Sequence, residues 1–290
     1  LHKAIRRQRQ MCIRDSCIRV NFCLLYDILI CTIKVLNLGR FIMKRIDFEN
    51  GTVTNNILSA ALPMLVAQIL NLLYNIVDRI YIARIHDIGT TALGAVGLCF
   101  PIIMIITAFS NLFGSGGAPI FSINRGKGDS RTADMIMNTA FTMLCGSAAV
   151  LMLIGFLFAR PLLTLFGASD DALVYAYPYL MIYLLGTLPS MIATGMNPFI
   201  NAQGYAIIGM LSVTVGAVAN IILDPIFIFV LDMGIKGAAI ATVISQILSA
   251  LLVFYFLHGK SELKVRWIHI NEISECTRPV SYTHLRAHET

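Results

Sequence analysis

The chain has 290 residues, of which 57% are hydrophobic and only 13% are charged, and its mean hydropathy is +0.75. This composition excludes an ordinary water-soluble domain and indicates that lipid surrounds most of the side chains. The formal net charge of +6 does not favour nucleic acid as a partner, because the basic residues lie in short loops and at the two ends rather than along one helical face.

The seven cysteines form no pattern that indicates a metal or redox site. Only Cys99 and Cys145 lie in the hydrophobic body of the chain, and no pair has the C-x-x-C spacing. Both lie inside apolar runs, where a cysteine behaves as a small hydrophobic residue. We therefore expect neither a disulfide scaffold nor a bound cofactor.

Both ends of the chain differ in composition from what lies between them. Residues 1–42 open with basic residues, carry scattered cysteines and contain an apolar stretch interrupted by Asp27, so we interpret them as a non-native leader. The strings 6–16 and 280–290 resemble translated sequencing-adapter sequence. We expect a membrane domain over 43–267, and a cytoplasmic tail over 268–290 whose end, like the leader, is not part of the fold.

Six largely uncharged runs between the charged clusters are each long enough to cross a hydrocarbon core about 30 Å thick. They cover 55–83, 92–122, 134–159, 172–196, 206–231 and 236–257. Prolines inside them are tolerated where neighbouring groups satisfy the freed carbonyls, and the glycines of Gly114-Ser-Gly-Gly117 are typical of close helix packing. The sequence therefore predicts an all-α membrane protein, a bundle of six transmembrane helices.

The loop cations predict the orientation. One side of the six spans would hold Lys44, Arg45, Arg125, Lys127, Arg131, Lys260, Lys264 and Arg266, and the other only Arg84, Arg160 and Lys236. Positive residues are enriched on the cytoplasmic side of membrane proteins. We therefore expect a multi-pass protein of a prokaryotic plasma (inner) membrane, with its N-terminus in the cytoplasm.

Asp224 is the only charged residue between Asp171 and Asp232, and it lies deep in the fifth run. A charge at a helix centre costs about 2.5–3.5 kcal/mol on insertion scales, so such residues usually face a bundle interior or a water-filled cavity. Pro225 leaves the carbonyl of Ile221 without its helical donor, and Asn220 lies one turn before Asp224 on the same face. These oxygens suit a hard cation or a transferable proton.

Two other runs carry polar stripes. Gln68, Asn71, Asn75 and Asp78 recur at three- and four-residue intervals, and Thr242, Gln246 and Ser249 do the same in the last run. Counting along the spans places Asp78, Asp224, Tyr179 and Thr242 at similar depth in the outer half of the membrane. We predict that these four groups form a single site.

Structural interpretations of these residues remain open. Asp78 near a helix end could pair with Arg79 or Arg84, and Asp224 could be a protonated hydrogen-bonding residue. Asn220 could join two helices, and Tyr179 and Thr242 could serve in packing.

The stretch from Phe48 to Trp267 resembles the N-terminal lobe of multidrug and toxic compound extrusion (MATE) antiporters. The resemblance rests on Pro63, Gln68, Asn71 and Asp78, on the LGAVGLCFP segment that ends at Pro101, and on Asn220-Ile-Ile-Leu-Asp224-Pro225. It implies that Asp78, Asn220 and Asp224, with Tyr179 and Thr242, bind the coupling ion, Na⁺ or H⁺. The polar stripes themselves predict that Gln68, Asn71, Asn75 and Gln246 line a polar cavity. A bound Na⁺ would lie at Asp78, Asn220, Asp224 and Thr242.

The resemblance also implies partners and an activity. The substrates would be small organic cations, including drugs, and a second six-helix lobe, absent from this chain, would complete the cavity, so we expect no transport by the chain alone. A flippase for lipid-linked sugars is an alternative, although no long basic groove is evident. An intramembrane aspartyl protease is another, although the aspartates stand in Ile-Val-Asp and Leu-Asp-Pro rather than in Gly-x-Gly-Asp and Tyr-Asp.

Overall fold

The computed structural model describes residues 52–85, 88–261 and 265. The chain divides into two units between Ile42 and Met43, and every described residue belongs to the second unit. The leader predicted over 1–42 and the tail predicted over 268–290 therefore lie outside the described residues.

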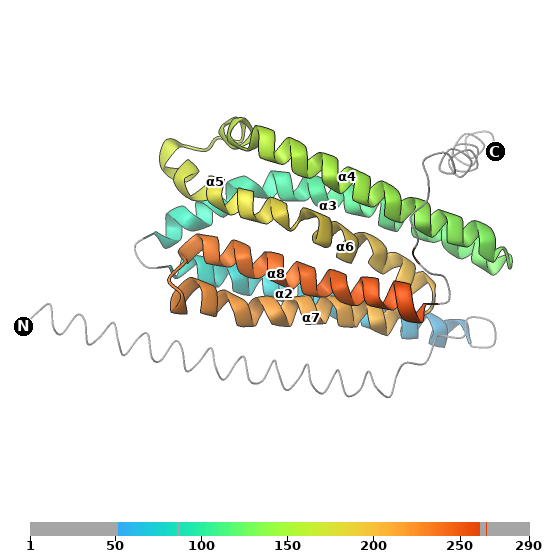
Figure 1. Ribbon diagram of the computed structural model, residues 1–290. Helices are drawn as coiled ribbons and strands as arrows, with labels where there is room; N and C mark the ends of the chain where they lie inside the picture. The colour runs from blue at the N-terminus through green and yellow to red at the C-terminus, as the bar shows by residue number, and fades with distance from the viewer. Residues whose placement is uncertain (1–51, 86–87, 262–264, 266–290) are drawn as a thin grey trace, which may run out of the picture. The chain divides into compact units, whose positions relative to one another are not determined.

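The described residues form helices joined by short turns (Figure 1). The helices are α2 (Val53–Ala83), α3 (Gly89–Gly126), α4 (Ser130–Leu165), α5 (Asp170–Leu185), α6 (Thr187–Ala202), α7 (Ala206–Pro225) and α8 (Gly234–Tyr255). Two π-helical turns, η1 (Ile226–Val230) and η2 (Phe256–Lys260), continue α7 and α8. The fold class predicted from the sequence is confirmed for these residues: five helices are each long and apolar enough to cross a membrane, and α5 with α6 makes a sixth, bent span.

The fourth span differs from the straight run predicted over 172–196. It extends from Asp170 to Ala202 and bends by 56° between α5 and α6, at Gly186. Pro189 contributes to the bend, because it has no N–H to donate to the carbonyl of Leu185 and its ring would crowd that carbonyl in a continuous helix. The chain therefore ends one helix and begins another in the middle of the span.

Two of the helices, α4 and α5, have N-terminal caps formed by polar side chains that lie outside the apolar runs. The carboxylate of exposed Asp129 accepts hydrogen bonds from the Thr132 hydroxyl at 2.6 Å and from the Thr132 amide at 3.0 Å, which caps α4. These hydrogen bonds, the hydroxyl's first, lower the pKa of Asp129. Ser169 caps α5 in the same way, through the amide of Ala172 at 3.4 Å.

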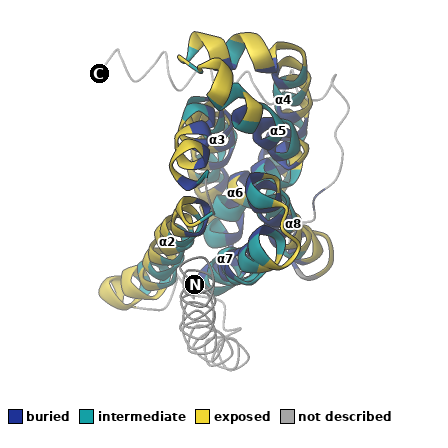
Figure 2. Cartoon of the chain, turned by 90° about the vertical axis from the view of Figure 1, so that its left-hand side faces the viewer, coloured by how far each residue is buried: buried dark blue, intermediate teal, exposed yellow. Residues whose placement is uncertain are grey.

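The centre of the bundle is α6, which packs against α3, α4, α7 and α8 (Figure 2). Its closest approach is to α3, where a Cβ on Gly114 would collide with the backbone of Gly195. A Cβ on Gly117 would lie 2.8 Å from the ring of Phe199, whereas one on Gly116 would meet nothing within 4 Å. The close packing predicted for this glycine-rich segment is thus confirmed at two of its three glycines.

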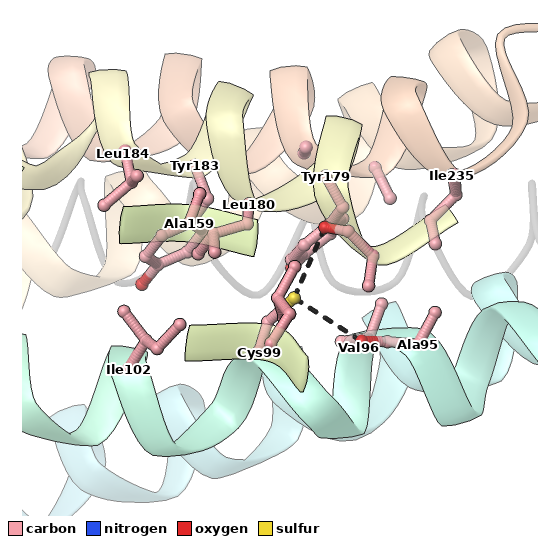
Figure 3. Packing of buried hydrophobic residues seen from close by; sticks show 14 of the residues in the cluster. Ala95, Val96, Cys99, Ile102, Ala159, Tyr179, Leu180, Tyr183, Leu184 and Ile235 are labelled. Atoms are coloured by element: carbon pink, nitrogen blue, oxygen red, sulfur yellow. Dashed lines mark hydrogen bonds between the residues drawn. The ribbon is translucent and has the colours of Figure 1, made fainter. Parts of the chain in front are cut away.

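Buried apolar side chains gather in two clusters. One lies where α2 ends and α3 begins, and it includes Cys99, Tyr179 and Tyr183 (Figure 3). The thiol of Cys99 donates to the carbonyls of Ala95 at 3.4 Å and Ala176 at 3.6 Å, so it joins α3 to α5. The other cluster lies at the opposite end of α3 and includes Phe121 and Phe199. These two clusters pack together the helices that carry the polar site described next.

Candidate functional site

Two carboxyl groups from helices far apart in the sequence meet inside the bundle. Asp78 of α2 and Asp224 of α7 lie within hydrogen-bonding reach of each other. The Asp224 side chain is fully buried, and α2 packs along α7. The structure therefore brings together the two acidic residues that the sequence placed at similar depth.

Asn220 and Thr242 extend this site onto α8. The amide nitrogen of Asn220 donates to Asp224 Oδ1 at 3.2 Å and to the Thr242 hydroxyl at 3.4 Å. That hydroxyl donates in turn to the carbonyl of Ala238 at 2.9 Å. Asn220 is 2% exposed, so its side chain is committed to these contacts within the protein. The group of Asp78, Asp224, Asn220 and Thr242 is called the carboxylate site below.

Three oxygens of the carboxylate site are buried without a hydrogen-bond donor among the described residues. They are Asp78 Oδ1, Asp224 Oδ2 and Asn220 Oδ1. Buried polar atoms nearly always have a partner, and two carboxylates that meet in a low-dielectric interior repel each other unless a positive charge lies between them. The donor set, which consists of carboxylate, amide and hydroxyl oxygens, fits a proton or a hard cation such as Na⁺.

The local sequence explains why the backbone also changes here. Pro225 follows Asp224 directly, and α7 gives way at that point to the π-helical turn η1. A proline removes a helical donor, and π-helical turns within helices are frequent at functional sites. The turn lies beside α8, against which η1 packs.

Tyrosines surround the two carboxyl groups. Tyr179, which is 3% exposed, lies near both Asp78 and Asp224 and stacks on Tyr183 with ring centroids 6.2 Å apart. Tyr74 of α2 also lies near both aspartates. The sequence interpretation named Tyr179 but missed Tyr74 and Tyr183. Tyr183 follows Tyr179 by one helical turn, and this spacing could have indicated it.

Arg79, one of the partners that the sequence left open for Asp78, lies near that carboxyl group and also contacts an aromatic ring on α3. The guanidinium of Arg79 lies 5.2 Å from the ring centroid of Phe100, a cation–π contact between α2 and α3. Adjacent residues do not share a helix face. The arginine thus contacts α3, and the carboxyl group of Asp78 contacts Asp224 on α7.

The residues predicted to line a polar cavity take different positions. Gln68 and Asn75 are exposed, Asn71 is partly buried, and Asn75 donates to the carbonyl of Asn71 at 2.7 Å within α2 itself. Gln246 instead faces α5, where its amide nitrogen donates to the Tyr183 hydroxyl at 3.4 Å. A role for these four residues in lining a cavity stays a prediction.

A second polar group lies on α6 and α7, outside the residues that the sequence singled out. Asn197 donates to the carbonyl of Gly209 at 2.9 Å and to the hydroxyl of Ser212 at 3.0 Å, and Asn201 donates to Asn197 Oδ1 at 3.1 Å. A Cβ on Gly209 would collide with both asparagines. The predicted fourth span stopped at residue 196, so these asparagines were not considered.

Comparison with known proteins identifies the fold. The profile of the MatE family matches residues 63–226. Multidrug export protein MepA of Staphylococcus haemolyticus is 28% identical over 215 residues, which are 74% of this chain and 47% of that protein. The chain spans about half the length of the curated relatives that it matches.

Solved structures agree with this match. A crystal structure of MATE in the bent conformation has a TM-score of 0.69 and 26% identity, over 77% of this chain and 50% of that chain. A MOP superfamily transporter from Pyrococcus furiosus, whose binding pocket is described as reversed in polarity, has the same TM-score, identity and coverage. Because the family profile covers more than half of its residues, the chain belongs to the MatE family of multi-pass membrane transporters.

Proposed function

We propose that the chain is one half of a Na⁺- or H⁺-coupled transporter that exports small organic cations, including drugs. Its place would be the inner membrane of a prokaryote, with the N-terminus in the cytoplasm, and a second six-helix half would complete it. The name of the staphylococcal relative, multidrug export protein, supports the substrate class. The pocket polarity described for the Pyrococcus protein makes the charge of the substrate the property to measure first.

The observation that carries the proposal is the group of three donorless oxygens in the carboxylate site. Asp78, Asp224 and Asn220 each contribute one, and Thr242 adds a hydroxyl beside them. A proton shared by the carboxyl groups, or a Na⁺ ion held among these oxygens, would remove the repulsion between two buried negative charges. When that ion leaves, the repulsion returns, and the energy becomes available to change how α2 lies against α7.

Neutralising substitutions in the complete transporter test this proposal. We expect Asp78→Asn and Asp224→Asn each to abolish ion-driven drug efflux from cells or vesicles, because neither leaves a pair of carboxylates to exchange an ion. Asp232→Asn is the matched control, since Asp232 is an exposed aspartate in a turn with φ of 51°, which asparagine also adopts readily. The amount of each variant in the membrane is measured alongside.

Full efflux by both Asp78→Asn and Asp224→Asn would overturn the proposal. Loss of efflux in the Asp232→Asn control would also count against it, because charge at this end of the bundle, rather than the carboxylate site, would then matter. Efflux driven by a Na⁺ gradient at constant pH, compared with efflux driven by a pH gradient without Na⁺, identifies the coupling ion.

A further inference from the structure

The bend between α5 and α6 is surrounded by polar side chains from both helices and from α8. The hydroxyl of Tyr183, in the last turn of α5, lies near the side chain of Ser190, in the first turn of α6, on the other side of the bend. Gln246 of α8 donates to the same Tyr183 hydroxyl at 3.4 Å. One tyrosine hydroxyl therefore lies where the two halves of the broken span meet a third helix.

Gln246 also fills the space beside Gly186, the residue at the bend. A Cβ on Gly186 would lie 2.5 Å from Gln246 Oε1 and 2.9 Å from Val243 Cγ2. The backbone of Gly186 has an ordinary φ of −81°, so glycine is required there for space and not for its conformational freedom. Gln246 Oε1 is buried without a donor among the described residues, as is the hydroxyl of fully buried Thr187, the next residue. Two buried polar atoms at the bend thus lack hydrogen-bond partners among the described residues. A different angle between α5 and α6 would therefore break no hydrogen bond to these two atoms.

This group of residues touches the carboxylate site through aromatic rings. Tyr183 stacks on Tyr179 with an angle of 19° between the rings, and both lie near Asp78. Tyr183 also lies near Tyr74, on the helix that carries Asp78. A shift of Asp78 relative to Asp224 would therefore displace the rings of Tyr179 and Tyr183. Tyr183 lies at the bend between α5 and α6, so its displacement would change the contacts there.

We propose that Gln246 is a positioning residue that links the bend at Gly186 to the ion occupancy of the carboxylate site, with Tyr183 as the connecting side chain. Gln246 holds Tyr183 against the aspartates and occupies the inside of the bend, so the angle between α5 and α6 follows the position of Asp78. The proposal rests on the proposed function, because it needs an ion that binds at the carboxylate site. Discontinuous helices in other secondary transporters combine binding and movement in this way.

The test measures the bend directly in the complete transporter, purified and placed in lipid nanodiscs. Spin labels at exposed Val174 on α5 and exposed Thr194 on α6, in a background without other reactive cysteines, report the distance across the bend. The distance is measured at alkaline pH with and without Na⁺, and at acidic pH without Na⁺. Ion binding is measured on the same samples, by ²²Na⁺ retention and by proton uptake.

We expect the ion to shift the label distance in the unsubstituted transporter. Gln246→Met, which keeps length and removes the amide, should abolish that shift and leave ion binding in place, and Tyr183→Phe should do the same. Tyr177→Phe is the matched control, because Tyr177 lies on the same helix and its ring receives Arg160 at 5.0 Å. The control should keep the full shift.

Gly186→Ala separates this role from simple packing. The added methyl group should change the label distance and make it insensitive to the ion. Gly186→Ala with Gln246→Ala should restore the original label distance, because the collision with Gln246 is gone, but not the response to the ion, because the amide that donates to Tyr183 is gone as well. Restoration by Val243→Ala instead of Gln246→Ala would overturn the proposal, because the close approach would then be apolar packing only. An ion-dependent shift that persists in Gln246→Met would overturn it as well.

The same experiment distinguishes failure of this inference from failure of the proposed function. Ion binding that survives Asp224→Asn, or is absent from the unsubstituted transporter, contradicts the carboxylate site itself, and with it the link to Gln246. Ion binding that depends on Asp224 but leaves the label distance unchanged contradicts the link alone.

Discussion

Thr242 contributes a hydroxyl to the carboxylate site without contributing charge. Its oxygen accepts from Asn220 and donates to the carbonyl of Ala238. We expect Thr242→Val, which keeps the shape and removes the hydroxyl, to raise the concentration of coupling ion needed for half-maximal efflux about tenfold. Loss of a hydrogen bond in a charged site costs about 1.5 kcal/mol, and 1.4 kcal/mol is a factor of ten.

Thr242→Ser keeps the hydroxyl and should remain within about twofold of the unsubstituted protein, since removal of one methyl group leaves the hydrogen bonds intact. Equal affinities in the valine and serine variants would mean that Thr242 serves only in packing, the alternative that the sequence left open.

At the scale of single residues, the sequence correctly predicted that Asp224 and Asp78 lie close together, while their role stays a prediction. A lone charge in an apolar run is costly, and counting along the spans gave both aspartates a similar depth. The sequence did not predict the position of Gln246, which shares a stripe with Thr242 but contacts Tyr183 across the bundle. That contact depends on the bend at Gly186, and periodicity within one helix carries no information about a neighbouring helix.

Substitutions where α3 crosses α6 test how closely whole helices pack against each other. We expect Gly114→Ala to destabilise the protein by about 1–3 kcal/mol, as overpacking of a close contact does, because the new methyl group would collide with the backbone of Gly195. Thermal unfolding in detergent, followed by the loss of helical circular dichroism or by aggregation, measures the change.

Gly116→Ala provides the control on the same helix, since its methyl group would meet nothing within 4 Å. It should match or slightly exceed the unsubstituted protein, because alanine favours a helix over glycine by about 1 kcal/mol. Equal destabilisation by both substitutions would show that helix propensity or lipid contact, rather than the crossing, determines the effect.

The elements themselves were predictable because hydrophobic length and charge spacing determine where a chain can cross a bilayer. The break in the fourth span was not predicted. Prolines are tolerated inside membrane helices, and Pro63 and Pro101 do lie inside unbroken α2 and α3. Pro189 differs in its surroundings: Gly186 admits Gln246 and Val243 to the backbone just before it. Such a difference arises from tertiary packing and not from the proline.

Orientation is a property of the whole molecule, and it remains a prediction from the loop cations. We expect Ser130→Cys, at the exposed start of α4, to react with a membrane-impermeant maleimide only when the cytoplasmic face is accessible. Met233→Cys, exposed in the turn before α8, should react from the outside of intact cells. Labelling of Ser130→Cys in intact cells would reverse the proposed topology.

The packing of α2 along α7 has a consequence for biosynthesis. Roughly 120 residues lie between the end of α2 at Ala83 and the start of α7 at Ala206. At about 5–20 residues per second, the ribosome needs roughly 6–25 seconds to make them. During that time α2, with Asp78, Gln68 and Asn75, resides at the translocon or in the bilayer before its main partner exists. Its polar side chains therefore depend on water, on the insertion machinery or on α3 until α7 arrives.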